Sequence, residues 1–290
     1  MTAASPGGPF TERTPRVAAA RQLTRRAGRE RAGRFLAEGA QAVREALAWA
    51  ESGGGVVHEL FATDVAEERN GDLVARARTA GIAVSSITER AAVGLSETVT
   101  PQGLVAVCDL LDVSPETALD RRPALVAVLV DVADPGNAGT VIRVADAAGC
   151  GAVVLAGDTV DPHNGKCVRA STGSLFHLPV ARSRDIGAVL ASCRDAGLRL
   201  VAADGAATTD LDTADRQGVL ARPTAWVFGS EAHGLCSGTL ELTDAAVRVP
   251  IHGRAESLNL ATAAAVCLYA GARAQRQPLE GVVGQRRPGA

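Results

Sequence analysis

The sequence predicts an α/β protein of two domains: a small α/β/α unit followed by a larger unit with a doubly wound, mostly parallel sheet. Apolar runs alternate with helix-like segments along most of its 290 residues, a length that suffices for two domains. Residues 124–130 form an unbroken apolar run, which is typical of a strand buried on both faces of a parallel sheet. Loops rich in Gly, Pro and Asn follow later strands, where α/β sheets bind their ligands.

The N-terminal domain is predicted over residues 21–112, after a tail. Residues 1–20 are rich in Pro, Gly, Ala and Thr, so we expect this tail to be disordered. The spacing of apolar residues predicts a helix over 36–50, which the glycines at 53–55 end. The later elements are a strand at 56–61, a helix at 65–80, a strand at 82–84, a helix at 86–93 and a strand at 103–108. This alternation predicts the α/β/α arrangement.

A polar segment at 113–123, with a Ser-Pro pair and two consecutive Arg, is predicted to link the domains. The C-terminal domain is expected over 124–276, before a second disordered tail at 277–290. Its predicted strands lie at 124–130, 152–156, 198–203, 224–228 and 246–249. Its predicted helices lie at 139–148, 185–196 and 257–273, with a helical or turn-like stretch at 166–175. Because strands and helices alternate, the connections predict a mostly parallel sheet.

Composition excludes several functional classes. No apolar run approaches the roughly 20 residues of a membrane span, and the sequence begins without an apolar signal segment. The six Cys include no CxxC pair and the five His have no ligand spacing, so we expect neither a disulfide framework nor a metal site. A nucleophile elbow and a dinucleotide fingerprint are also missing. We therefore expect a cytoplasmic protein with reduced cysteines.

The formal net charge of -2 conceals a basic segment near the N-terminus. Between residues 11 and 34, eight Arg stand against two Glu. Segments of this kind often bind nucleic acid, and Arg25 and Arg26 are its candidate RNA-binding residues. The alternative is a solvated arm without a partner, and charge alone does not separate the two interpretations.

Three segments of the C-terminal domain carry the strongest functional signal: 134–143, 228–235 and 249–260. Each starts at the end of a predicted strand and is rich in Gly, Pro, Asn or Ser, the residues of tight loops with exposed backbone groups. They also hold polar side chains that a plain loop does not need, namely Asn137, Arg143, Glu231, Ser257 and Asn259. A ligand-binding edge of the sheet would use such residues.

Taken singly, these side chains also have structural interpretations. A surface ion pair with Asp146 would account for Arg143. Helix capping would account for Ser257, which stands at a predicted helix start, and for Glu231 if a helix begins in the irregular stretch that follows it. The joint occurrence of the three segments, in this order, favours the functional interpretation.

In order and spacing, the three segments resemble the motifs of the SpoU/TrmH family of RNA ribose 2'-O-methyltransferases, in the knotted SPOUT superfamily. The resemblance covers roughly residues 122–273. It implies S-adenosylmethionine as the cofactor, held by the backbone around Gly229, Val249, Ile251 and Leu258. It also implies a deep trefoil knot in the C-terminal domain and a homodimer packed through that domain.

The resemblance assigns catalysis to Arg143, with Asn137, Glu231, Ser257 and Asn259 around it. Glu231 is expected to organise its loop by a hydrogen bond with Asn137, while Ser257 and Asn259 help to bind the target ribose and phosphate. Because a guanidinium stays protonated, we expect Arg143 to position the 2'-oxygen and stabilise the developing alkoxide rather than act as a base.

Two further segments concern the RNA. Residues 166–174 resemble the family's stretch between the first two motifs, and Lys166 and Arg169 share one helical face that suits an RNA backbone or, alternatively, only solvent. The N-terminal unit resembles the family's substrate-binding domain through the segments 35–39 and 100–103. That resemblance favours 23S rRNA as substrate, with either a housekeeping or an antibiotic-resistance role. The alternatives left open are a tRNA methyltransferase, a non-catalytic RNA-binding protein and a small-molecule α/β enzyme.

Overall fold

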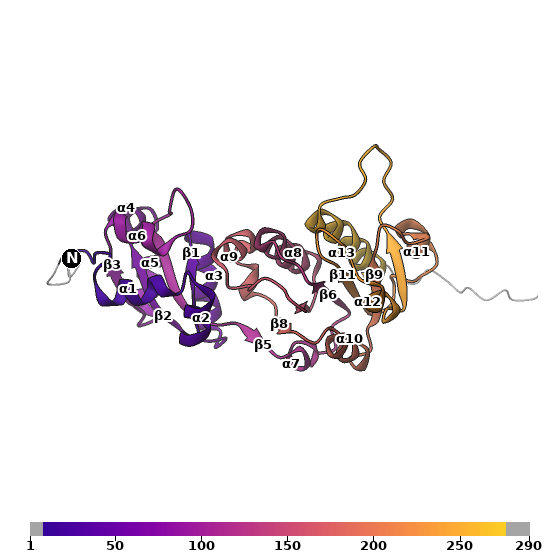
Figure 1. Cartoon of the computed structure of the whole chain (residues 1–290). Coiled ribbons are helices and arrows are strands. Elements are labelled where there is room, and N and C mark those ends of the chain that lie inside the picture. The colour runs from indigo at the N-terminus through magenta and orange to yellow at the C-terminus, as the bar shows by residue number, and fades with distance from the viewer. Residues whose placement is uncertain (1–7, 277–290) are drawn as a thin grey trace, which may run out of the picture.

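The computed structural model describes residues 8–276 and contains two α/β domains that lie side by side along the long axis of the molecule (Figure 1). The N-terminal sheet has the strand order β1-β4-β2-β3. Its strands are β1 (Arg34–Glu38), β2 (Val57–Ala62), β3 (Ala83–Ser86) and β4 (Leu104–Asp109). The β4 strand runs antiparallel to β1 and β2, whereas β2 and β3 are parallel.

Helices cover both faces of this N-terminal sheet, as predicted. They are α1 (Pro15–Gln22), α2 (Arg26–Ala32), α3 (Ala40–Glu51), α4 (Asp64–Arg69), α5 (Gly71–Thr79) and α6 (Glu89–Leu95). One apolar layer joins α1 and α6 to the sheet through residues such as Val17 and Phe61. The other joins α3 and α5 through residues such as Leu47 and Leu73.

The prediction of a disordered tail over residues 1–20 is wrong from residue 8 onward. Residues 15–22 form α1, which begins with Pro15 in its first turn and buries Val17 and Ala20. Phe10 forms a bridge with Ile87 at the edge of the sheet. Few apolar residues stand in this stretch, so its sequence pattern gave no helix signal. Residues 1–7, and the tail predicted at 277–290, lie outside the described residues.

Two predicted helices of this domain are wrong in extent. The helix predicted over 36–50 combines the end of β1 with α3, and Gly39 separates them with a φ of +97°, a conformation that favours glycine. The helix predicted over 65–80 is two helices, because the backbone leaves the helical region at Asn70. Apolar spacing continued across both breaks, so the sequence did not reveal them.

The C-terminal sheet has the strand order β10-β12-β9-β11-β6-β7-β8-β5, and its recorded pairings are all parallel. Its strands are β5 (Asp112–Val113), β6 (Leu125–Val130), β7 (Ala152–Ala156), β8 (Val180–Ser183), β9 (Arg199–Ala203), β10 (Thr209–Asp210), β11 (Thr224–Phe228) and β12 (Ala245–Arg248). The central strands β6, β7 and β11 are buried along their whole length. The parallel sheet is therefore confirmed.

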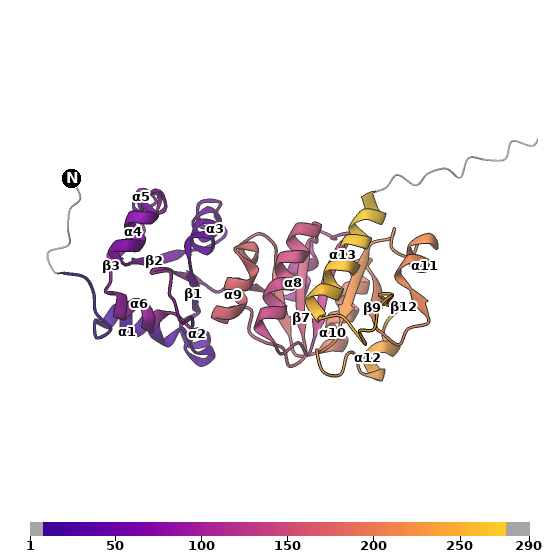
Figure 2. The same ribbon diagram turned by 90° about the horizontal axis from the view of Figure 1, so that it is seen from above.

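Helices cover both faces of this sheet too, which confirms the doubly wound architecture. They are α7 (Pro115–Leu119), α8 (Pro135–Ala148), α9 (Gly165–Ser171), α10 (Ile186–Asp195), α11 (Leu211–Arg216), α12 (Ser237–Glu241) and α13 (Leu260–Arg276), with a 3-10 turn η1 (Ser174–Phe176). The helices α8 and α13 lie next to each other on one face (Figure 2), and α7 and α10 pack on the other. The trefoil knot stays a prediction.

The segment predicted as a linker at 113–123 is instead part of the C-terminal domain. Its first residue completes β5, which pairs with β8 at the edge of the sheet. The helix α7 follows, capped by Ser114, and buries Ala118 and Leu119 beneath the sheet. The polar composition of the segment reflects the exposed side of this short helix. No helix within residues 8–276 is long and apolar enough to cross a membrane.

Candidate active site

The carboxyl ends of β6, β9, β11 and β12 meet at one edge of the large sheet, where a cavity of about 650 Å³ opens. Pockets of this size hold small-molecule ligands. The cavity is lined by the second and third sequence segments, including Gly229, Glu231, Val249, Ile251, Ser257 and Leu258. Each of the four predicted cofactor-binding residues therefore lies in its wall.

A chain of hydrogen bonds joins the three segments beside this cavity. The Oε1 atom of Glu231 accepts hydrogen bonds from Asn137 Nδ2 at 3.0 Å and from the Asp134 amide at 3.2 Å. Its Oε2 atom accepts from the Ala133 amide at 3.2 Å. Asn137 Oδ1 in turn accepts from Asn259 Nδ2 at 3.0 Å. The predicted bond between Glu231 and Asn137 is thus confirmed, and Asn259 extends it to the third segment.

The two carboxylates of this network are held in their ionised form. Partial burial works against the charge of Glu231, but hydrogen bonds from Asn137 and the backbone outweigh it and lower the pKa. The pKa of Asp134 is also lowered, first by a hydrogen bond from Lys166 at 2.6 Å and then by the Asn137 amide. At neutral pH both groups are therefore acceptors only.

The start of α13 explains why Asn259 and Ser257 differ in role. Asn259 Oδ1 accepts hydrogen bonds from the amides of Ala261 at 2.9 Å and Thr262 at 3.3 Å, so Asn259 caps the helix. The predicted start of this helix at Ser257 is wrong by three residues, and with it the capping role of Ser257. Ser257 is instead exposed and lines the cavity, where its hydroxyl is available to a ligand.

Glycine is required at position 229. A Cβ atom there would lie 2.1 Å from the backbone carbon of Gly234, because the loop turns back on itself. Backbone hydrogen bonds between Ser230 and Gly234, at 3.1 and 2.9 Å, hold this turn. The turn presents Glu231 toward the first segment and leaves backbone exposed along the cavity.

The first segment differs from its prediction in where the helix begins. Residues 134–137 are not a separate turn, because Asp134 caps α8 by accepting a hydrogen bond from the Asn137 amide at 2.8 Å, and Pro135 opens the helix. The Asp-Pro pair was the available signal for this start. Sequence reasoning did not single out Asp134, although it holds both Asn137 and Lys166 in place.

Arg143 stands apart from the network and does not line the cavity. It follows Asn137 by six residues on α8, which turns it toward another side of the helix. Its exposed guanidinium donates to Thr172 Oγ1 at 3.2 Å. The alternative pair with Asp146 is not formed, since Asp146 lies 2.7 Å from His177 Nδ1.

The four predicted RNA-binding residues have different surroundings. Arg25 is exposed just before α2, and Arg26, the first residue of α2, is exposed but forms an ion pair with Glu30 at 2.9 Å. Lys166 is held by Asp134. Arg169 forms an ion pair at 3.2 Å with Glu38 of β1, whose side chain is buried, so its charge is used to join the two domains.

The cavity suits a ligand with an apolar ring and a polar end. Apolar side chains of Phe228, Val249 and Leu258 stand on its wall together with loop backbone and the hydroxyl of Ser257. Within the described residues, no group of three potential metal-ligating side chains is present. The site therefore offers binding and hydrogen bonding rather than metal ligands.

Comparison with known proteins identifies this arrangement. Residues 124–269 match the SpoU rRNA Methylase family, and residues 14–106 match the MRM3-like substrate binding domain. The chain belongs to the SpoU rRNA methylase family. The second match also places the start of the N-terminal domain ahead of the predicted residue 21, in agreement with α1.

Relatives of the whole chain belong to the same family. The 23S rRNA (guanosine(2553)-2'-O)-methyltransferase RlmP of Bacillus subtilis is 37% identical over 81% of this chain and 87% of its own. An AdoMet-bound rRNA methyltransferase from Sinorhizobium meliloti superposes with a TM-score of 0.77 at 30% identity, covering 90% of this chain and 95% of its own. The AdoMet complex of the SpoU methyltransferase AviRb from Streptomyces viridochromogenes gives 0.74 at 31% identity, covering 90% and 98%. Both domains of this SpoU protein are thus shared with its relatives.

Proposed function

We propose that this protein transfers a methyl group from S-adenosylmethionine to the 2'-hydroxyl of a ribose in structured RNA, and that its substrate is 23S rRNA. The observation that carries the proposal is the hydrogen-bond chain from Glu231 through Asn137 to Asn259, which assembles three loops beside the cavity. Membership of the SpoU family and the 23S rRNA activity named for the Bacillus subtilis relative support it. Such an enzyme works in the cytoplasm, where it meets ribosomal RNA.

The cavity is the proposed cofactor site. The backbone around Gly229, Val249 and Ile251 would hold the adenine and methionine parts, with Leu258 against the ring. S-adenosylmethionine supplies an activated methyl group on a sulfonium, so the transfer requires no metal ion. Ser257 lines the cavity, and Asn259 lies beside it, hydrogen-bonded to Asn137 of α8; together they would hold the ribose and its phosphate.

Arg143 is the proposed catalytic residue, and its position makes a homodimer part of the proposal. A ribose hydroxyl is a weak acid, so a guanidinium beside the 2'-oxygen would stabilise the charge that develops on it. Because Arg143 of one chain does not line that chain's cavity, a second copy is the natural source of the guanidinium. The helix α13 leaves Val266 and Tyr269 exposed, by 39% and 53%, and a partner's C-terminal domain would cover them.

The experiment that tests the proposal is methyl transfer from labelled S-adenosylmethionine to protein-free rRNA and to tRNA, with primer extension to map the product. We expect one modified ribose in 23S rRNA. Transfer to tRNA alone would show that the substrate is tRNA, while the proposed methyl transfer would stand. If the protein binds the cofactor but methylates neither RNA, assembling ribosomal particles are the next substrate to test. If it neither binds the cofactor nor transfers a methyl group, the result favours a non-catalytic RNA-binding protein.

Glu231→Gln should weaken S-adenosylmethionine binding about tenfold, because one acceptor oxygen of the loop network becomes a donor that faces a backbone amide or the Asn137 amide. Glu231 receives three hydrogen bonds, on both of its oxygen atoms, so no orientation of a Gln amide can satisfy all of them. Calorimetric titration measures the effect. Glu241→Gln is the matched control: it removes the same charge from α12, away from the cavity wall, and should leave the Kd unchanged. An unaltered Kd in Glu231→Gln would show that the loop does not depend on this carboxylate.

A further inference from the structure

A second, small pocket lies where the two domains meet, at the carboxyl ends of β7 and β8. Its volume is about 110 Å³. It is lined by Arg26 of α2, by residues that follow β7, and by the end of β8 with the residue after it, which together are Arg26, Gly157, Asp158, Thr159, Arg182, Ser183 and Arg184. Because β6, β7 and β8 are parallel neighbours, this pocket opens at the same edge of the sheet as the Glu231 network.

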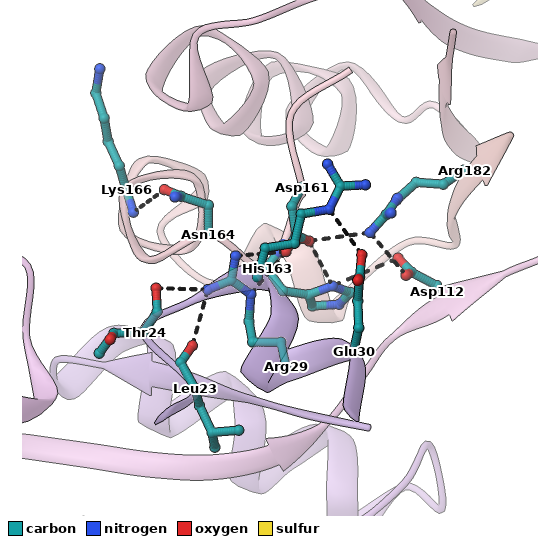
Figure 3. Close-up of polar contacts among 11 residues, drawn as sticks. Leu23, Thr24, Arg29, Glu30, Asp112, Asp161, His163, Asn164, Lys166 and Arg182 are labelled. Atoms are coloured by element: carbon teal, nitrogen blue, oxygen red, sulfur yellow. Dashed lines mark hydrogen bonds and ion pairs between the residues drawn. The ribbon is translucent and has the colours of Figure 1, made fainter. Parts of the chain in front are cut away.

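Two carboxylates outside the pocket wall hold the guanidinium of Arg182. Its Nη1 atom lies 3.3 Å from Asp161 Oδ1 and 3.5 Å from Asp112 Oδ2 (Figure 3). Its other two nitrogen atoms make no hydrogen bond to any residue between 8 and 276. Arg182 is therefore held in one orientation while it keeps donors for a ligand.

The other two arginines keep guanidinium nitrogen atoms available for a ligand. Arg184 is exposed and has no ion pair or hydrogen bond from its side chain in the described part of the chain. Arg26 donates its Nε atom to Glu30, which leaves its Nη atoms available. Asp158 is the one carboxylate in the pocket wall, which holds three guanidinium groups. Two of these groups are also paired with carboxylates outside the wall, Arg26 with Glu30 and Arg182 with Asp161 and Asp112, so Arg184 is the one that brings an unpaired charge within the described residues.

The pocket is framed by contacts that cross the domain boundary. Arg29, one turn after Arg26 on α2, pairs with Asp161 at 2.7 Å, and both side chains are buried (Figure 3). Asp161 thus accepts hydrogen bonds from Arg29 of one domain and Arg182 of the other. The buried pair fixes the distance between Arg26 and the end of β8, so the pocket is part of the docked structure.

The chemistry of the pocket selects a phosphate group. Guanidinium forks match the oxygen atoms of a phosphate, and the hydroxyl groups of Ser183 and Thr159 add neutral donors. A volume of about 110 Å³ is below the range that accommodates a whole small-molecule ligand, but it suffices for one oxyanion. A phosphate within a longer chain can enter such a pocket while its neighbours stay outside.

We infer that this pocket binds a backbone phosphate of the RNA substrate and directs the strand along the edge of the sheet toward the Glu231 network. The inference rests on the proposed function, because it takes the RNA as the ligand. It gives Arg182 and Arg184 a role in positioning RNA, and it gives Arg26 a defined contact within the basic N-terminal segment.

Arg184→Gln tests the inference most directly, because Arg184 has no structural partner to lose. We expect its Kd for a 23S rRNA transcript to rise about tenfold and the slope of log K against log salt to fall by about one, as for the loss of one phosphate contact. Arg121→Gln is the control, since Arg121 is an exposed arginine just before β6, at the opposite edge of the sheet. Its Kd should match the wild type.

Two results would overturn the inference: an unchanged Kd and salt slope in Arg184→Gln, or an equal loss in Arg121→Gln. Modification of arginine by phenylglyoxal, read by peptide mass spectrometry, separates the sources of the phosphate. Protection of Arg184 by the transcript at concentrations where inorganic phosphate gives none supports an RNA site. Equal protection by inorganic phosphate, or no protection, overturns it. Because this readout needs no methyl transfer, it decides the pocket's role even if the enzymatic proposal fails.

Discussion

Arg143→Ala should reduce the rate of methyl transfer about a thousandfold and leave the Kd for S-adenosylmethionine unchanged. The size of the loss follows from removing a charged donor at the atom where negative charge develops in the transition state. The Kd should hold because the proposed role of Arg143 is at the ribose 2'-oxygen rather than at the cofactor. In the described residues its guanidinium hydrogen-bonds only to Thr172, outside the cavity of its own chain. Arg143→Lys should also lose much of the activity, since a point charge cannot copy the two-pronged contact of a guanidinium. Single-turnover transfer to 23S rRNA and calorimetric titration measure the two quantities.

Mixing variants shows which chain supplies this arginine. If Arg143 serves the partner's cavity, combining the Arg143→Ala and Glu231→Gln proteins creates one intact site in each mixed dimer. The assay is run at an S-adenosylmethionine concentration below the wild-type Kd, where the Glu231→Gln site is about tenfold less occupied than that intact site. With random exchange of subunits, activity should then recover to about a quarter of the wild-type level. Recovery would also establish the homodimer. If activity stays at the level of the separate variants while mixed dimers form, Arg143 works within its own chain.

Arg29→Ala should have the largest effect on stability, about 3–5 kcal/mol, because it removes the closer and fully buried partner of the Asp161 carboxylate and leaves only the longer contact with Arg182. Arg29 is 3% exposed, and its Nη1 atom also donates to the backbone oxygens of Leu23 and Thr24 at 3.0 and 3.1 Å. Burial opposes the charge of Asp161, but hydrogen bonds from His163 and the charge of Arg29 outweigh it and hold the pKa well below its ordinary value. A carboxyl with a lowered pKa stabilises the fold above its unfolded pKa, so the pair contributes fully at pH 7 and is lost only in strong acid.

A comparison within one helix isolates this effect. Arg26→Ala removes an exposed pair with Glu30 from the same helix α2 and should cost less than about 1 kcal/mol. Adding Asp161→Asn to Arg29→Ala should restore part of the lost stability, because the buried charge that lost its closer partner is then gone. Denaturation followed by circular dichroism gives the three values. If Arg29→Ala unfolds no more easily than Arg26→Ala, the pair does not hold the domains together.

The sequence predicted best those parts of the fold in which apolar residues are continuous. The strands β6, β7 and β11 were placed within one residue, because a strand buried on both faces is a plain apolar run. The strand β8 was missed because two of its four residues, Val-Ala-Arg-Ser, are polar; Arg182 donates to Asp161 at the domain junction, and Ser183 accepts from the amide of Asp185. The helix α1 was missed for a related reason, since only part of one face is buried.

In the candidate site, too, some contacts could be predicted from the sequence and others could not. The bond between Glu231 and Asn137 could be predicted because the resemblance to the SpoU/TrmH motifs, which each residue helps to form, implies it. The pairing of Arg169 with Glu38 could not, since it depends on how the two domains dock. The arginine pocket was equally hidden: Arg26 and Arg184 are distant in the chain, and neither stands in a motif. Sequence patterns locate the loops, but contacts between elements far apart in sequence are set by packing.

The short strand β5 has a consequence for how a target nucleotide is chosen. Through its pairing with β8, the chain that leaves the N-terminal domain is anchored in the sheet that carries the catalytic loops. The N-terminal domain is therefore held in a fixed position relative to the C-terminal sheet and is not joined to it by a free linker. Under the proposed function, we therefore expect a ribose to be selected by its distance and direction from the RNA feature that the N-terminal domain binds.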